Sequence, residues 1–164
     1  MAAPRRKSTE SPALAVSPDT EAVLLRYKRE QPEIGQQLEH FFDLFRGIGV
    51  PMSFAPESLL ALDEAFTSLA EQIADEAESD EAANDDLMVL IQLCGFYWGA
   101  LVIELVGGEW GYDEEEGSQV LGAPGIDRPV SVFDPFIQKA QNHKFSLVKE
   151  FERLTGVKVG MAEG

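Results

Sequence analysis

Residues 87–106 form an almost uninterrupted apolar stretch, in which only Gln92 and Glu104 are strongly polar. A stretch of this length is either a core helix covered on most sides or a membrane span. Acidic residues flank it, and no lysine or arginine anchors either end, so the cationic bias that marks membrane spans is missing. We therefore expect a central buried helix and no membrane partner.

Two glycines in this stretch, Gly95 and Gly99, have the GxxxG spacing. In a membrane span this spacing indicates a dimerisation face. In a core helix it lets another element approach the backbone closely, and this is the role that we expect here.

Cys94, beside these glycines, is the only cysteine of the chain. A single cysteine excludes an intramolecular disulfide and is typical of a reducing cytoplasm. Burial in an apolar helix would raise the pKa of its thiol, so we expect no cysteine nucleophile.

The negative charge is concentrated in one contiguous region. No lysine, arginine or histidine occurs between Arg46 and Arg128, whereas this region contains eighteen aspartates and glutamates. The formal net charge of the whole chain is −16. A field of this sign excludes nucleic acid as an ordinary partner and favours a basic protein or cations.

Periodic apolar residues and turn signals predict the remaining elements. We expect a single α+β domain over residues 19–158, in which several helices surround the central apolar helix beside a small antiparallel sheet of two to three strands. Residues 1–18 are expected to form a disordered basic tail, and residues 159–164 a short C-terminal tail. The expected helices span about 20–31, 33–46, 56–79, 87–106, 135–142 and 145–154, with an acidic connection over 80–86, and the expected strands span 109–112, 119–121 and 129–133.

One candidate binding surface lies on the helix expected over residues 56–79. Acidic residues recur there every seven residues, on the face opposite an apolar stripe. Such a face is either a binding surface for a basic partner or a solvated outer face. Solvated helix faces usually mix charges of both signs and gain i,i+4 ion pairs, but this face contains no cation. The candidate residues are Glu57, Glu64, Glu71 and Glu78.

A second candidate surface is the acidic loop that follows Trp110 and Tyr112. The loop consists of Asp113, Glu114, Glu115 and Glu116. The two aromatic residues before it supply anchors of the kind that protein interfaces use. The loop lacks the spaced ligands of a calcium-binding loop. We expect no metal and no cofactor.

Sequence motifs of enzymes are missing. The chain contains no GxxxxGK[ST], GxGxxG or HExxH motif and no cysteine pair with metal spacing. Glu104, near the end of the apolar helix, needs a partner if it is buried, and Arg128 and Lys139 are the candidates. We expect a structural ion pair there rather than a general acid, and we assign no catalytic residue.

A pattern of segments in the second half of the chain consists of GFYWG (95–99), LVGGEW (105–110), VFDPF (132–136), Lys139 and FSLVKEFERL (145–154). Over about residues 93–154, this pattern resembles a family of small bacterial domains of unknown function. The resemblance implies helices packed on a small antiparallel sheet, in a bacterial cytoplasm. Ala100 replaces an acidic residue that is frequent in the family, so the resemblance implies no polar site. Some small acidic proteins of this kind are encoded beside toxins as immunity partners.

These features predict a non-enzymatic, cytoplasmic, acidic domain that binds a basic protein. An immunity protein for a basic toxin is the concrete form of this hypothesis. One alternative is a nucleic-acid mimic that inhibits a DNA-binding enzyme. Another is a metal-dependent enzyme that uses Glu104 or the 113–116 cluster. The sequence does not indicate an oligomeric state.

Overall fold

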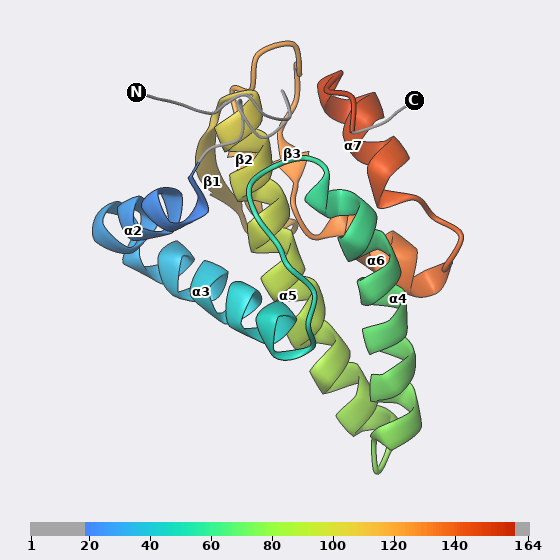
Figure 1. The fold of residues 1–164 in the computed structure, drawn as a ribbon. Coiled ribbons are helices and arrows are strands. Elements are labelled where there is room, and N and C mark those ends of the chain that lie inside the picture. Colours follow the sequence, from blue (N-terminus) through green and yellow to red (C-terminus); the bar gives the residue numbers. More distant parts are fainter. Residues whose placement is uncertain (1–18, 160–164) are drawn as a thin grey trace.

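In the computed structural model, the apolar stretch lies within α5 (Asp80–Leu105), which runs through the middle of an α+β fold (Figure 1). The structure describes residues 19–159, so the predicted N-terminal tail and most of the predicted C-terminal tail lie outside the described residues. The other elements are α2 (Thr20–Glu30), α3 (Pro32–Gly47), α4 (Ser58–Glu76), β1 (Glu109–Asp113), β2 (Gly117–Leu121), β3 (Val130–Ser131), α6 (Asp134–Gln141) and α7 (Leu147–Thr155).

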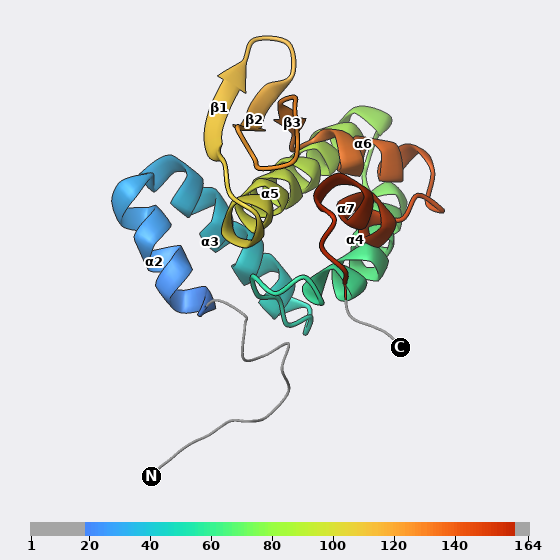
Figure 2. The same ribbon diagram turned by 90° about the horizontal axis from the view of Figure 1, so that it is seen from above.

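Other elements surround α5 on several sides, as the view from above in Figure 2 shows. Tyr97 stacks on Phe41 of α3, with ring centroids 4.4 Å apart. On another face, Trp98 meets Phe136 of α6 and Phe151 of α7 edge to face. By length and composition α5 could cross a membrane, and 61% of its most apolar window is buried inside the structure. The prediction of a central apolar helix within an α+β fold is confirmed.

The start of α5 differs from the prediction, because residues 80–86 are helical rather than a connecting loop. The hydroxyl of Ser79 accepts a hydrogen bond from the backbone N–H of Ala82 and so caps the helix. Asp80 and Glu81 lie in the first turn, where negative charge interacts favourably with the helix dipole. These local interactions outweigh the repulsion between the acidic side chains.

The sheet region comes close to the backbone of α5 at the two glycines of this helix. A Cβ atom on Gly95 would collide with the ring of Phe133 and would lie 3.0 Å from the carbonyl oxygen of Val132. A Cβ atom on Gly99 would collide with the ring of Trp110 and would lie 2.8 Å from a methyl group of Val132. The glycines therefore allow a close approach to the helix backbone, as the GxxxG spacing predicts.

The sheet is antiparallel, with strand order β1-β2-β3. The hairpin of β1 and β2 pairs Glu109 with Leu121 at one end and Asp113 with Gly117 at the turn. The third strand is shorter than predicted, because Phe133 already has a helical backbone conformation and leads into α6.

An ion pair between Asp63 and Lys139 joins α4 to α6. Lys139 is almost fully buried, and its Nζ lies 2.9 Å from Oδ1 of Asp63. The same ammonium group donates to the carbonyl oxygens of His143 and Phe145, at 3.1 and 2.7 Å. Oδ1 of Asp63 also accepts from the backbone N–H of Leu147, at the start of α7. This network uses all three donors of the lysine.

The partner predicted for Glu104 was wrong. Glu104 pairs with Arg26 of α2, not with Arg128 or Lys139. Burial lowers the pKa of Arg26, but the hydrogen bond to Glu104 and its charge outweigh burial and raise the pKa above its usual value. The pair fastens α2 to the end of α5 and gives Glu104 a structural role.

We predict that Gly99→Ala lowers the free energy of unfolding by about 1–3 kcal/mol, because an added methyl group overpacks the contact with Trp110. Urea denaturation followed by circular dichroism measures this change. The control is Gly47→Ala at the end of α3, where an added Cβ meets no atom within 4 Å. Equal stability of the two variants would contradict the close contact.

We predict that Lys139→Met costs about 3–5 kcal/mol, because it leaves the Asp63 carboxylate and two carbonyl groups without their donor. The matched control is Lys144→Met, which removes an exposed lysine from the following turn and should change stability by less than about 0.5 kcal/mol. A small loss for Lys139→Met would show that the network contributes little.

Candidate functional site

The acidic residues predicted to form one face of a helix do not all lie on that helix. Glu64 and Glu71 are exposed on α4, whereas Glu57 precedes the helix and Glu78 lies in the turn after it. Glu71 also has a histidine as a neighbour, since Nδ1 of His143 lies 3.7 Å from its carboxylate. The helix face is therefore shorter than the sequence predicts.

The predicted aromatic anchors of the hairpin differ in burial. Tyr112 is 75% exposed. Trp110 packs inward on α5, with its ring centroid 5.8 Å from that of Phe96. In the turn, the carboxylate of Asp113 accepts hydrogen bonds from the backbone N–H groups of Glu115 and Glu116, both at 2.9 Å. Asp113 thus shapes the turn, and the glutamate side chains remain exposed.

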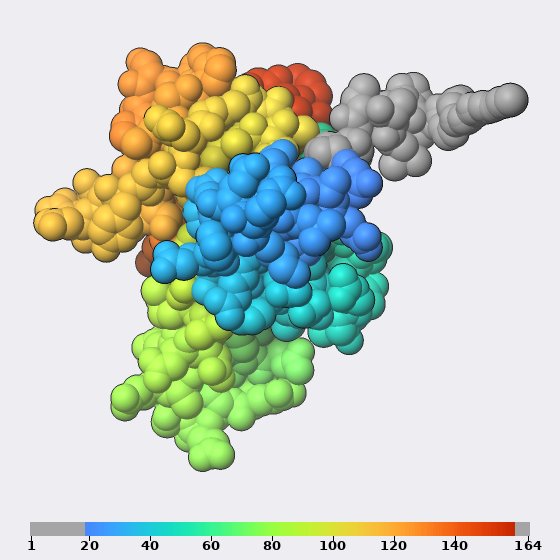
Figure 3. Space-filling view, turned by 90° about the vertical axis from the view of Figure 1, so that its left-hand side faces the viewer, coloured from blue at the N-terminus to red at the C-terminus, as the bar shows by residue number. Residues whose placement is uncertain are grey.

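A hollow of about 460 Å³, which we call the hairpin groove, lies between α5, the β1–β2 hairpin and the start of α6. Figure 3 shows the hairpin and the α4–α5 end projecting from the body, with a recess between them. The groove brings together three of the predicted site residues, Tyr112, Glu115 and Glu116. Its other lining residues that matter here are Met88, Ile91, Phe96, Ser131, Phe133, Asp134 and Ile137.

The floor of the hairpin groove is apolar and open to solvent. Met88 is 56% exposed and Ile137 is 37% exposed. The rings of Phe96 and Phe133 meet edge to face beneath them, at 5.7 Å between centroids. These residues could not be predicted as site residues from the sequence, because Met88 belongs to the apolar stretch and its exposure depends on which elements cover α5.

The rim of the hairpin groove is acidic. Glu115 and Glu116 contribute from the hairpin turn and Asp134 from the first residue of α6. None of the three forms an ion pair with a cation among residues 19–159. Asp134 accepts a hydrogen bond from the amide of Gln138 at 2.6 Å. The groove therefore offers exposed apolar surface surrounded by uncompensated negative charge.

A second apolar groove lies on the other side of α5, between α3 and α4. Its volume is about 520 Å³, and its lining includes Ile48, Val89, Glu76 and Asp86. Val89 is 56% exposed, the same fraction as its neighbour Met88 in the hairpin groove. Adjacent positions of α5 thus face two different hollows.

The side chains that were candidates for catalysis are either buried or held in an ion pair. Burial raises the pKa of the Cys94 thiol well above its usual value, which makes it a poor nucleophile at neutral pH. Glu104 is held by Arg26. Within the described part of the chain, no three His, Cys, Asp or Glu side chains gather in an arrangement that could hold a metal ion.

Comparison with protein-family models, with curated proteins and with solved structures finds no match for this chain. The resemblance of residues 93–154 to a bacterial domain family therefore stays a prediction. The physical character of the hairpin groove is the basis for a functional proposal.

We predict that the melting temperature rises between 0.01 M and 0.3 M NaCl, because the acidic residues of the central region repel one another in the folded state. Salt shortens the range of this repulsion from about 30 Å at 0.01 M to about 10 Å at 0.1 M. Thermal melts followed by circular dichroism test this, and KCl should act like NaCl if screening is the cause. A flat or falling curve would contradict the prediction.

Proposed function

We propose that this protein is a non-enzymatic binding domain whose hairpin groove docks a basic, amphipathic segment of a partner protein. The observation that supports this most strongly is the apolar floor inside an unpaired acidic rim. Exposed apolar surface that is framed by polar residues is typical of interaction sites.

The apolar floor favours a protein segment over other basic ligands. Met88, Ile137 and Tyr112 supply flexible and aromatic surface, which suits the burial of side chains such as leucine or phenylalanine. The groove volume falls within the range of about 300–1,000 Å³ that is usual for ligand pockets. We therefore propose that it holds a few side chains of a short segment rather than the whole face of a folded domain.

The charge pattern favours a cationic segment. Lysine or arginine residues beside the apolar anchors would meet Glu115, Glu116 and Asp134 at the rim. The net charge of −16 would also attract such a partner from a distance and speed its association at low ionic strength. A basic toxin is one partner that would meet these requirements, in line with the immunity-protein hypothesis.

The proposal can be tested with a library of random twelve-residue peptides. We expect selection on the full chain to enrich peptides that combine apolar residues with lysine or arginine. Met88→Lys should weaken their binding at least about tenfold, because it places a cation on the groove floor. The matched control is Val89→Lys, which changes the adjacent and equally exposed position in the other groove and should bind normally.

Two results would overturn the proposal. One is the absence of any enriched peptide class, or the enrichment of acidic peptides. The other is equal loss of binding in Met88→Lys and Val89→Lys, which would indicate an effect on α5 as a whole rather than on the hairpin groove. Circular dichroism of both variants checks that the helix content is unchanged.

A further inference from the structure

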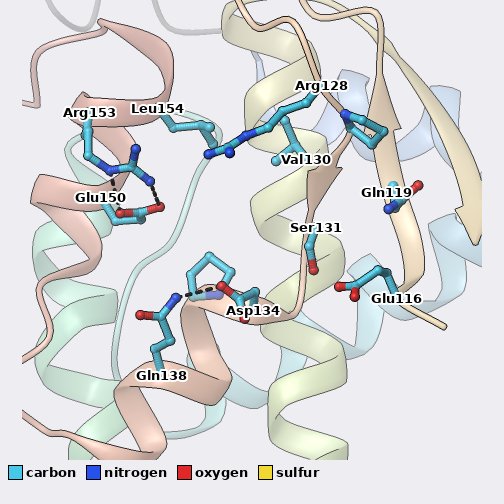
Figure 4. Close-up of a pocket in the computed structure, with 12 residues that line it drawn as sticks. Glu116, Gln119, Arg128, Val130, Ser131, Asp134, Gln138, Glu150, Arg153 and Leu154 are labelled. Carbon is cyan, nitrogen blue, oxygen red and sulfur yellow. Dashed lines mark hydrogen bonds and ion pairs between the residues drawn. The ribbon is translucent and has the colours of Figure 1, made fainter.

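The hairpin groove does not end at its acidic rim. Glu116, Ser131 and Asp134 line it and also line a neighbouring hollow of about 530 Å³. This second hollow, which we call the arginine hollow, is bordered by the sheet, the start of α6 and α7 (Figure 4). A segment bound in the hairpin groove can therefore continue past Ser131 into the arginine hollow.

The charges of the arginine hollow that have no ion-pair partner among residues 19–159 are separated in space. Figure 4 shows the side chain of Arg128 reaching across the hollow toward Leu154 and Arg153. Glu116 and Asp134 lie at the opposite end, where the hollow joins the hairpin groove. A ligand that enters from the hairpin groove thus meets carboxylates first and guanidinium groups second.

The guanidinium group of Arg128 has no ion-pair partner among residues 19–159. Of the five arginines among residues 19–159, it alone forms no ion pair, although three acidic residues line the same hollow. Its planar fork of donors is suited to bind a carboxylate through two parallel hydrogen bonds. Arg128 is also the first cation after the long acidic region of the sequence.

Arg153 is held in place beside it. Its Nε and Nη2 donate to the two carboxylate oxygens of Glu150, at 3.0 and 2.5 Å. A guanidinium group has five N–H donors, so the Nη1 group of Arg153 is not used in this pair. The far end of the hollow therefore combines an unpaired guanidinium with the spare donors of a second, oriented one.

We infer that the arginine hollow binds the free C-terminal carboxylate of the segment that docks in the hairpin groove. In this arrangement the carboxylate contacts Arg128, and a lysine or arginine close to the C-terminus contacts Glu116 and Asp134. The apolar anchors lie further back in the segment, on Met88 and Ile137. This inference rests on the proposed function and specifies the ligand as the basic, amphipathic C-terminus of a partner protein.

The test uses random peptides displayed with a free C-terminus. The best binder is then synthesised as the free acid and as the C-terminal amide, and both affinities are measured by isothermal titration calorimetry. We expect the amide to bind the full chain at least about tenfold more weakly than the acid. In Arg128→Gln this difference should disappear, because the acid loses its partner.

Arg29→Gln is the control, since it removes an exposed arginine of α2 that lies outside both hollows. It should preserve the preference for the acid. Equal affinity of acid and amide, or a preference that persists in Arg128→Gln, would overturn the inference and leave the proposed groove function intact. Failure to select any peptide would overturn the proposed function, and the inference with it.

Discussion

The structure depends on the burial of the apolar side chains of α5. Its apolar side chains project in several directions, so no single neighbouring layer can bury them. Aromatic residues of α3, α6 and α7 pack on Tyr97 and Trp98, and the sheet region occupies the glycine face. The close approach at Gly95 and Gly99 fixes where the hairpin sits relative to the helix. The hairpin groove is the space that remains at the edge of this packing.

Much of the fold could be predicted because its signals are local in sequence. The apolar stretch, the proline and glycine positions and the short alternating segments identify the α+β class and most elements. Ion pairs could not be assigned in this way. Arg26 and Glu104 are 78 positions apart, and Asp63 meets Lys139 only after α4 and α6 have packed together. Sequence spacing carries no information about such distant pairs.

The candidate site was predictable only in part. The acidic hairpin turn and Tyr112 were identified from composition, and they border the groove. Met88 comes from α5 and Phe133 and Ile137 from the start of α6, and each looks like an ordinary core residue in the sequence. Whether an apolar residue is covered depends on the lengths and angles of neighbouring elements. Trp110 illustrates the same limit, because it packs against the core although it adjoins the acidic loop.

The two apolar grooves beside α5 have a consequence for the behaviour of the protein at high concentration. In a neutral protein, open hydrophobic hollows on both sides of one helix would promote aggregation. Here each groove is bordered by acidic residues, and two copies that approach groove to groove bring like charges together. The same charge that we propose for recognition of a cationic segment thus keeps identical molecules apart. Solubility should fall near the isoelectric point, about 4.4, where this protection is lost.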